Sequence, residues 1–199
     1  MRSKLKIMLY FAGLTVLSVK GQPAAAYTLL QETTESGSRF YGNLGYVLIN
    51  SETKISAITA STNFTYGLNS SLGVQASLEQ AFSIPTMSSV YTLIELGIVY
   101  AVLGSLKTTH TEILFDGTPS VSSTDASLDT VKVVVSADQF FLNGSSQVVG
   151  LAGMSLAVYY DRLLYEKSGV SLGARAAIAG NGPTSIQPLQ IVAGFFWQL

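Results

Sequence analysis

The sequence predicts an all-β protein, a closed antiparallel up-and-down β-barrel that crosses a membrane with eight strands, or ten as the alternative. Three observations predict this fold class. Only 12% of the 199 residues are charged, about half the usual share, while 48% are hydrophobic. Long stretches alternate apolar with small polar residues, which is the period of a β-strand. After residue 26 the longest apolar candidate, 93–106, is too short for a helical span and contains Glu95.

The lipid environment predicts that the sheet is closed into a barrel. Lipid cannot hydrogen-bond the open edge of a sheet, so a membrane protein without membrane helices must be a closed barrel. The chain has no cysteine. This absence excludes disulfide bonds and disfavours a lipid anchor on cysteine.

The N-terminus has the composition of a secretory signal. Three basic residues precede an apolar run over 7–19, and an Ala-Ala-Ala site follows at 24–26. This order predicts a signal peptide over residues 1–26, with cleavage after Gly21 as an alternative. Residues 27–199 then form a single transmembrane barrel domain.

The charge of the exported chain limits its partners. Four of the 11 Lys and Arg residues lie within the first 26 residues, and all 12 Asp and Glu residues follow them. The net charge of residues 27–199 is therefore near −5. This sign argues against nucleic acid and anionic lipid headgroups as partners.

Nine segments after a polar lead-in over 27–38 have strand character. They are 39–50, 54–67, 71–82, 89–102, 107–116, 129–142, 147–161, 169–180 and 189–199. Asn, Ser and Gly separate them, and the prolines at 85, 119, 183 and 188 fall in loops or at a strand start. Because single-chain bacterial barrels have an even number of strands, we expect one segment not to span. The least convincing is 107–116, which is short and carries His110 and Glu112.

Alternation assigns a face to each strand. The hairpin over 62–78 shows the pattern, since its polar partners are small and uncharged where a water-facing strand would carry Lys or Glu. A barrel explains this, because lipid takes the apolar face and a narrow lumen takes small polar residues. The residues predicted to face outward are Phe64, Tyr66, Ile94, Leu96, Val133, Leu172, Phe195 and Trp197. Those predicted to lie at the membrane interfaces are Tyr46, Tyr66, Tyr159 and Trp197.

Five charged residues fall on the opposite, lumen face: Glu79, Glu95, Lys132, Asp138 and Arg175. Charges at membrane depth are costly unless paired, so their placement inside is informative. They predict either a path for a substrate or ion, or a hydrogen-bonded plug in a narrow barrel; we favour the plug, because an eight-stranded lumen is only wide enough for side chains. For Arg175 we expect a carboxylate partner from among Glu79, Glu95 and Asp138.

The stretch "YGLNSSLGVQASL" resembles the strand–turn–strand hairpins of small bacterial outer-membrane β-barrels of the porin-like or OmpA/OmpW-like class. The final strand "LQIVAGFFWQL" is similar to the last strand of that class, which carries a signal for the barrel-assembly machinery. Here the chain ends on Leu199, with Trp197 and Phe195 before it, rather than on an aromatic residue. The resemblance implies location in the bacterial outer membrane, with membrane lipid and the assembly machinery as partners. It identifies no subfamily.

No motif predicts catalysis or a cofactor. His110 is the only histidine, and no serine follows it at the spacing of outer-membrane deacylases. The acidic segment 116–129 has no calcium-loop spacing and is interpreted as a solvated outer loop. We therefore expect a non-enzymatic barrel, either structural or a narrow passage for small solutes, with a polar lumen filled by side chains. The alternatives are an adhesive barrel acting through its outer loops, chiefly 116–129, and a soluble secreted lipid-binding barrel.

Overall fold

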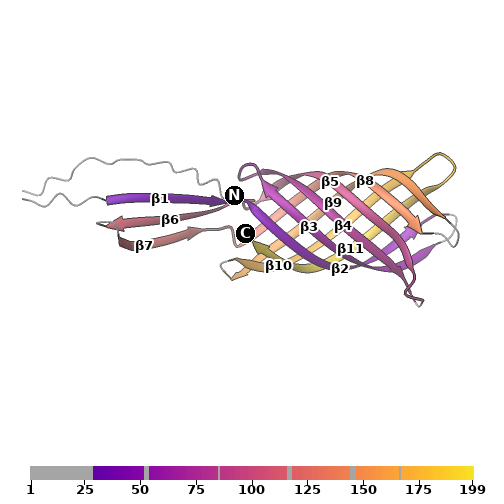
Figure 1. Ribbon diagram of the computed structural model, residues 1–199, viewed down its shortest axis with the longest axis horizontal. Helices are drawn as coiled ribbons and strands as arrows, with labels where there is room; N and C mark the ends of the chain where they lie inside the picture. Colours follow the sequence, from indigo (N-terminus) through magenta and orange to yellow (C-terminus); the bar gives the residue numbers. More distant parts are fainter. Residues whose placement is uncertain (1–28, 52–53, 85, 116–117, 144–146, 166) are drawn as a thin grey trace, which may run out of the picture. The chain divides into compact units, whose positions relative to one another are not determined.

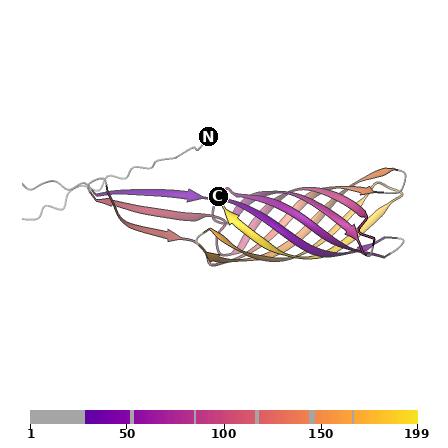
Figure 2. The same cartoon turned by 60° about the horizontal axis from the view of Figure 1, so that its bottom comes forward.

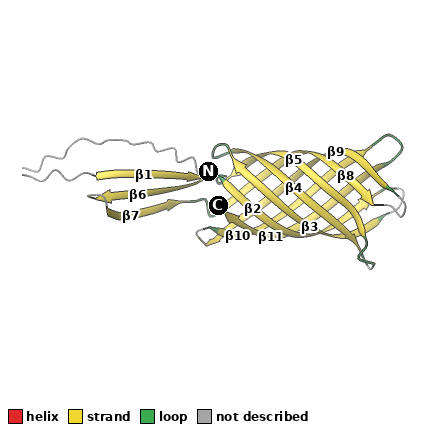
Figure 3. Ribbon diagram, in the orientation of Figure 1, coloured by secondary structure: helices red, strands yellow, loops and turns green. Residues whose placement is uncertain are grey.

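The computed structural model describes residues 29–51, 54–84, 86–115, 118–143, 147–165 and 167–199. They form two compact units. The barrel unit comprises Gly37–Lys107 and Ser127–Leu199, and the sheet unit comprises the described residues up to Ser36 with Thr108–Ala126. The regular structure of both units is β-strand, as Figure 3 shows. No helix within the described ranges is long and apolar enough to cross a membrane.

Eight strands form the barrel, and each is antiparallel to both of its neighbours. They are β2 (Ser38–Asn50), β3 (Ile55–Gly67), β4 (Leu72–Ser83), β5 (Ser89–Leu103), β8 (Asp129–Asn143), β9 (Val148–Tyr165), β10 (Ser168–Gly180) and β11 (Ser185–Gln198). Pairing of β11 with β2 completes the ring (Figure 1). The predicted closed eight-stranded barrel is confirmed, and the ten-stranded alternative is wrong.

The two ends of the barrel are built differently. At the terminal end, where β2 begins and β11 ends, Leu199 N donates to Ser38 O at 2.9 Å. The turns after β3 and β9 lie at this end, where β5 also ends and β8 begins. At the loop end, four connections of four or five residues each join β2 to β3, β4 to β5, β8 to β9 and β10 to β11. Figure 2 shows the strands running obliquely between the two ends.

The side chain of Asn69 stabilises the turn between β3 and β4, which joins the two strands of the predicted hairpin. Asn69 Oδ1 accepts hydrogen bonds from the backbone N–H groups of Ser71 at 2.9 Å and Leu72 at 2.7 Å. An asparagine side chain that binds the backbone in this way replaces part of a turn. The register of the two strands follows from it, with Tyr66 opposite Val74 and Phe64 opposite Ala76.

The outward face of the barrel is apolar, as the alternation predicts. The eight residues predicted to face outward all do so: Phe64, Tyr66, Ile94, Leu96, Leu172, Phe195 and Trp197 are exposed, and Val133 is half-buried on the same face. Leu96 is 64% exposed and Ile191 69% exposed. A barrel soluble in water would bury such side chains and expose charged ones, so this surface is suited to lipid.

Two details differ from the sequence-based expectations. Tyr46, Tyr66 and Trp197 are exposed, but Tyr159 is 5% exposed and points into the barrel; Tyr160 takes the outward position. Pro188 lies inside β11 rather than at a strand start, because that strand begins at Ser185. A proline has no N–H to donate, and the β10–β11 ladder skips from Ala176 to Ala179 at this point.

The lumen is layered rather than uniformly polar. Its loop-end part is an apolar layer formed by Val47, Ile49, Ala57, Ala81, Tyr91, Leu93, Phe140, Leu151, Ala177, Ala179 and Ile186. Charged and polar side chains occupy the middle and the terminal half, beside a second apolar cluster that includes Val134, Tyr159 and Leu106. The expectation of a polar lumen is therefore wrong for the loop-end part. The cause is that inward positions near that end carry Val, Ile, Leu and Phe.

The sheet unit is a three-stranded antiparallel sheet in the order β1–β6–β7. Its strands are β1 (Leu29–Ser36), β6 (Thr108–Phe115) and β7 (Thr118–Asp125). The segment 107–116 is thus a strand outside the barrel, which accounts for the ninth predicted segment. Most of the polar lead-in over 27–38 forms β1, and most of the loop predicted over 116–129 forms β7, so the loop assignment of 116–129 is wrong. A single barrel domain was predicted over 27–199; in the structure the barrel comprises only β2–β5 and β8–β11. The predicted signal peptide over 1–26 lies outside the described residues.

Candidate functional site

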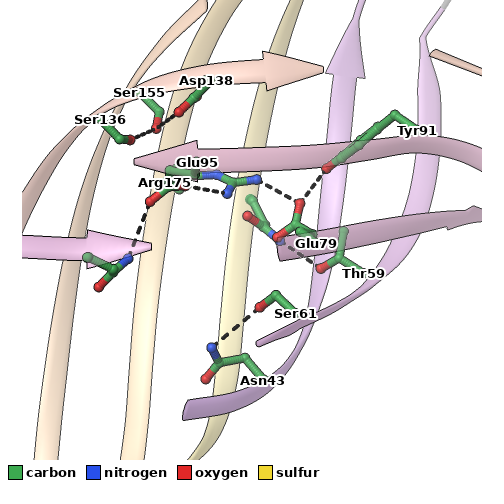
Figure 4. A network of polar contacts seen from close by, with 12 residues as sticks. Asn43, Thr59, Ser61, Glu79, Tyr91, Glu95, Ser136, Asp138, Ser155 and Arg175 are labelled. Carbon is green, nitrogen blue, oxygen red and sulfur yellow. Dashed lines mark hydrogen bonds and ion pairs between the residues drawn. The ribbon is translucent and has the colours of Figure 1, made fainter. Parts of the chain in front are cut away.

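Arg175 connects opposite walls of the barrel. Its Nη2 lies 2.7 Å from Glu79 Oε1, and its Nη1 lies 3.0 Å from Glu95 Oε2. Arg175 is in β10 and Glu79 in β4, which are four strands apart in either direction around the eight-stranded ring. All three side chains are at most 3% exposed (Figure 4). The guanidinium therefore bridges the lumen from one wall to the opposite one.

Glu79 accepts hydrogen bonds from two further polar side chains. Tyr91 OH donates to Glu79 Oε1 at 2.7 Å, and Gln190 Nε2 donates to Glu79 Oε2 at 2.7 Å. Gln190 also donates to Thr59 Oγ1 at 2.7 Å, and its backbone is opposite Arg175 in the β10–β11 register. A carboxylate with this many donors is fixed in position, which makes it a rigid receptor for the guanidinium.

Glu95 and Asp138 face each other in the β5–β8 register. Glu95 Oε1 accepts a hydrogen bond from Gln75 Nε2 at 3.3 Å. Asp138 Oδ1 accepts one from Ser155 Oγ at 3.2 Å, and Ser155 is 2.6 Å from Ser136 Oγ. Of the three carboxylates expected as partners of Arg175, Glu79 and Glu95 bind it, and Asp138 instead binds a pair of serine hydroxyls.

Lys132 belongs to a second cluster, nearer the terminal end. Its Nζ lies 3.0 Å from Asp161 Oδ2 and 3.7 Å from the centroid of the Tyr41 ring. Tyr41 OH donates to the same Asp161 oxygen at 2.8 Å, and Ser171 Oγ donates to Asp161 Oδ1 at 2.7 Å. Arg39 Nη1 lies 3.7 Å from Asp161 Oδ2. The structure therefore separates Lys132 from the other four predicted lumen charges.

Sequence reasoning missed Asp161 and Arg39. Both lie at the ends of predicted strands, where face assignment is weakest. Strand parity would have found them, because Asp161 follows the outward Tyr160 and Arg39 precedes the outward Phe40. With them, the buried side chains of the lumen include three cations (Arg39, Lys132 and Arg175) and four carboxylates (Glu79, Glu95, Asp138 and Asp161).

The described lumen side chains form a network of hydrogen bonds and ion pairs. In the part of the chain that the structure describes, no group of three or more His, Asp or Glu residues is arranged to hold a metal ion. His110 lies in β6 of the sheet unit, opposite Thr34 of β1 and Thr124 of β7. The histidine and the lumen carboxylates are thus in different units.

The comparisons define the class of protein by its fold. No protein-family model and no curated sequence matches the chain. Among solved structures, Neisserial surface protein A is 10% identical with a TM-score of 0.55, covering 83% of this chain and 99% of its own. The N-terminal β-barrel domain of Pseudomonas aeruginosa OprF is 10% identical with a TM-score of 0.51, covering 83% of this chain and 100% of its own. The chain therefore has the fold of small eight-stranded bacterial outer-membrane β-barrels.

Proposed function

We propose that this protein is a non-conducting barrel of the bacterial outer membrane, with a structural rather than a catalytic role. The closed ring, its outward apolar face and the fold shared with outer-membrane barrels support this location. Outward aromatic residues near the terminal end, Phe40, Tyr66, Tyr100 and Trp197, fit a girdle at a membrane interface. Membrane lipid is then the principal partner of the barrel surface.

The observation that carries the proposal is the bridge from Arg175 to Glu79 and Glu95. A passing solute would have to displace this bridge, leaving buried charges unpaired at a cost of several kcal/mol. It would then meet the loop-end layer, where Leu93, Phe140 and Leu151 are at most 2% exposed. An ion in that layer would lose its hydration without gaining a polar partner. The charged bridge and the apolar layer are two successive barriers to a solute, and together they favour a sealed lumen.

The other functions predicted from the sequence have weaker support. A narrow passage needs Arg175 to move away from both carboxylates. Adhesion through outer loops needs loops with surface to offer, and the four loop-end connections have four or five residues each. A soluble lipid-binding barrel needs a polar exterior, whereas Leu96 and Ile191 are exposed.

The last strand is the proposed contact for the barrel-assembly machinery. Its outward residues Leu189, Ile191, Phe195 and Trp197 alternate with inward ones up to the end of β11. Such a strand presents a regular apolar face before the ring closes. No cofactor is needed for this role.

Planar-bilayer recording on the purified full chain tests the seal. We expect no discrete conductance steps from the unmodified protein, and none from a Leu151→Ala variant that thins only the apolar layer. Arg175→Ala combined with Leu151→Ala opens both barriers and should give small or noisy steps. Lys54→Ala, which removes an exposed cation at the loop end, is the control. Reproducible steps from the unmodified protein would contradict the proposal, as would its absence from the outer-membrane fraction.

A further inference from the structure

Two of the charged residues in the barrel wall face outward. The eight barrel strands contain nine charged residues, and seven of these are buried in the lumen. The other two are Asp129, at the start of β8, and Arg162, near the end of β9, whose side chains are 41% and 59% exposed. Both lie at the terminal end, and the outward face of the barrel strands is otherwise uncharged. Charged groups on a lipid-facing wall are costly unless something at the membrane surface binds them.

The two outward charges form a pair. Asp129 and Arg162 face each other in the β8–β9 register, and Arg162 Nη1 lies 4.0 Å from Asp129 Oδ1. Tyr160 OH donates a hydrogen bond to the same carboxylate oxygen at 2.6 Å. The backbone beside the pair is held as well, because Leu163 N donates to Leu128 O at 2.7 Å. A carboxylate and a guanidinium are therefore fixed side by side on the outer surface.

Both groups keep atoms for a further partner. At 4.0 Å the guanidinium is beyond hydrogen-bond distance of the carboxylate, and among the described residues it has no closer ionic partner. Asp129 Oδ2 is used neither by the hydrogen bond from Tyr160 nor by the contact with Arg162. An exposed ion pair of this kind contributes only about 0–1 kcal/mol to stability. The pair is thus better suited to binding a ligand than to holding the barrel together.

The pair borders the aromatic girdle of the terminal end. Ser168 of β10 pairs with Trp197 of β11 on one side and with Tyr165 of β9 on the other. Tyr165 follows Arg162 by three positions in β9, and both Tyr165 and the intervening Leu164 are exposed. Such girdles lie where the apolar band of the membrane meets the headgroups. A lipid bound by the pair can therefore place its acyl chains against the outward apolar side chains.

We propose that Asp129 and Arg162 bind the headgroup of a zwitterionic phospholipid with a primary ammonium, as in phosphatidylethanolamine. The guanidinium donates N–H bonds to the phosphate, whose oxygens match its planar fork, and the carboxylate accepts N–H bonds from the ammonium. A two-carbon chain joins the two lipid groups, so they can reach protein groups that lie 4.0 Å apart. An anionic headgroup without an ammonium would leave Asp129 facing a like charge. This inference rests on the proposed membrane location and names the lipid class that the barrel surface selects.

Native mass spectrometry of the purified full chain in detergent measures the lipid preference. The probes are phosphatidylethanolamine, phosphatidylcholine and phosphatidylglycerol with the same acyl chains. Phosphatidylethanolamine should bind about tenfold more tightly than phosphatidylglycerol, which has a phosphate but no ammonium. It should bind about fivefold more tightly than phosphatidylcholine, whose quaternary ammonium has no N–H to donate. Equal binding of the three lipids overturns the inference, as does tighter binding of lipid A, whose phosphates have no ammonium. Displacement of the lipid by free phosphoethanolamine would also overturn it, because the site would then recognise a soluble ligand.

Substitutions separate the two halves of the pair. Arg162→Gln removes the phosphate ligand and should weaken the binding of phosphatidylethanolamine about tenfold. Asp129→Asn removes the selection, so phosphatidylethanolamine and phosphatidylglycerol should bind within about twofold of each other. Lys54→Gln, which removes an exposed cation at the loop end, is the control and should change binding less than about twofold. Retention of the full lipid preference by Asp129→Asn, or an equal effect of Lys54→Gln and Arg162→Gln, overturns the inference. The lipid series on the unmodified chain decides the matter if a variant does not fold.

Folding into lipid vesicles separates this inference from the proposed location. The unmodified chain should fold into vesicles of phosphatidylcholine, as the shift in gel mobility between folded and unfolded barrel reports, and should still prefer phosphatidylethanolamine in detergent. A chain that folds into the vesicles but shows no lipid preference keeps the membrane location and overturns the headgroup site. A chain that folds into vesicles of none of the three lipids overturns the location itself.

Discussion

Arg175 of β10 and Glu79 of β4 form an ion pair of 2.7 Å between opposite walls of the barrel. The two residues are 96 positions apart in the sequence. Their contact exists because the ring is closed and because inward positions of facing strands meet at its axis. Glu95 accepts the second arm of the same guanidinium, so one arginine is the cationic partner of two carboxylates. The stability of the barrel should therefore depend strongly on this one side chain.

Arg175→Ala should lower the free energy of unfolding by about 3–5 kcal/mol, because it leaves two buried carboxylates without their cation. Urea unfolding in detergent micelles, followed by the shift in gel mobility between folded and unfolded barrel, measures this. Lys54→Ala removes an exposed cation at the loop end and should change the free energy by less than about 0.5 kcal/mol. An equal response of the two variants would show that Arg175 is not the partner of the lumen carboxylates.

Removal of the whole charge cluster should be less harmful than removal of the arginine. Arg175→Met with Glu79→Gln and Glu95→Gln removes the arginine together with the charges of both carboxylates that bind it, and Tyr91 and Gln190 keep a polar partner at position 79. We expect the triple variant to be more stable than Arg175→Ala, with a free energy of unfolding about 2 kcal/mol higher. The same urea titration decides this. Additive losses from the three single substitutions would contradict a coupled network.

The barrel strands were predictable because one simple period runs through them. A lipid-facing side and a lumen-facing side force alternation, and the eight predicted spanning segments match β2–β5 and β8–β11 to within a few residues. β1 and β7 were not predicted as strands, because their Ser- and Thr-rich sequences show no apolar face. Nothing in a local pattern distinguishes such strands from loops.

The sequence predicted which charged side chains face the lumen, but not which of them contact one another. Alternation places Arg175, Glu79, Glu95, Asp138 and Lys132 inside, and the structure agrees. Which of them meet depends on the order of strands around the ring and on their stagger, which no local pattern contains. Glu79 and Glu95 were therefore indistinguishable from Asp138 as partners.

Asp161→Asn should destabilise the barrel more than Asp138→Asn. Asp161 binds Lys132, Tyr41 and Ser171, so its neutralisation leaves a buried ammonium without a counter-charge. We expect a loss of about 2–4 kcal/mol. Asp138 accepts a hydrogen bond from the hydroxyl of Ser155, and an asparagine can keep that bond. Asp138→Asn should therefore lower the free energy of unfolding by no more than about 1 kcal/mol. Thermal unfolding of the two variants in the same detergent gives the order, and a reversed order would contradict the assignment of Lys132 to Asp161.

Leu96→Arg tests the outward face directly. Leu96 lies at the middle of β5 and is 64% exposed, so in a bilayer its side chain faces hydrocarbon near the midplane. An arginine there should cost about 2–4 kcal/mol. Leu128 is the matched control, because it is 68% exposed but lies just before β8 at the terminal end. Leu128→Arg can place its guanidinium in water and should cost less than about 1 kcal/mol. Urea unfolding of both variants in phosphatidylcholine vesicles measures the difference. If the barrel surface faced water, both arginines would be tolerated equally, and that result would exclude a membrane-embedded barrel.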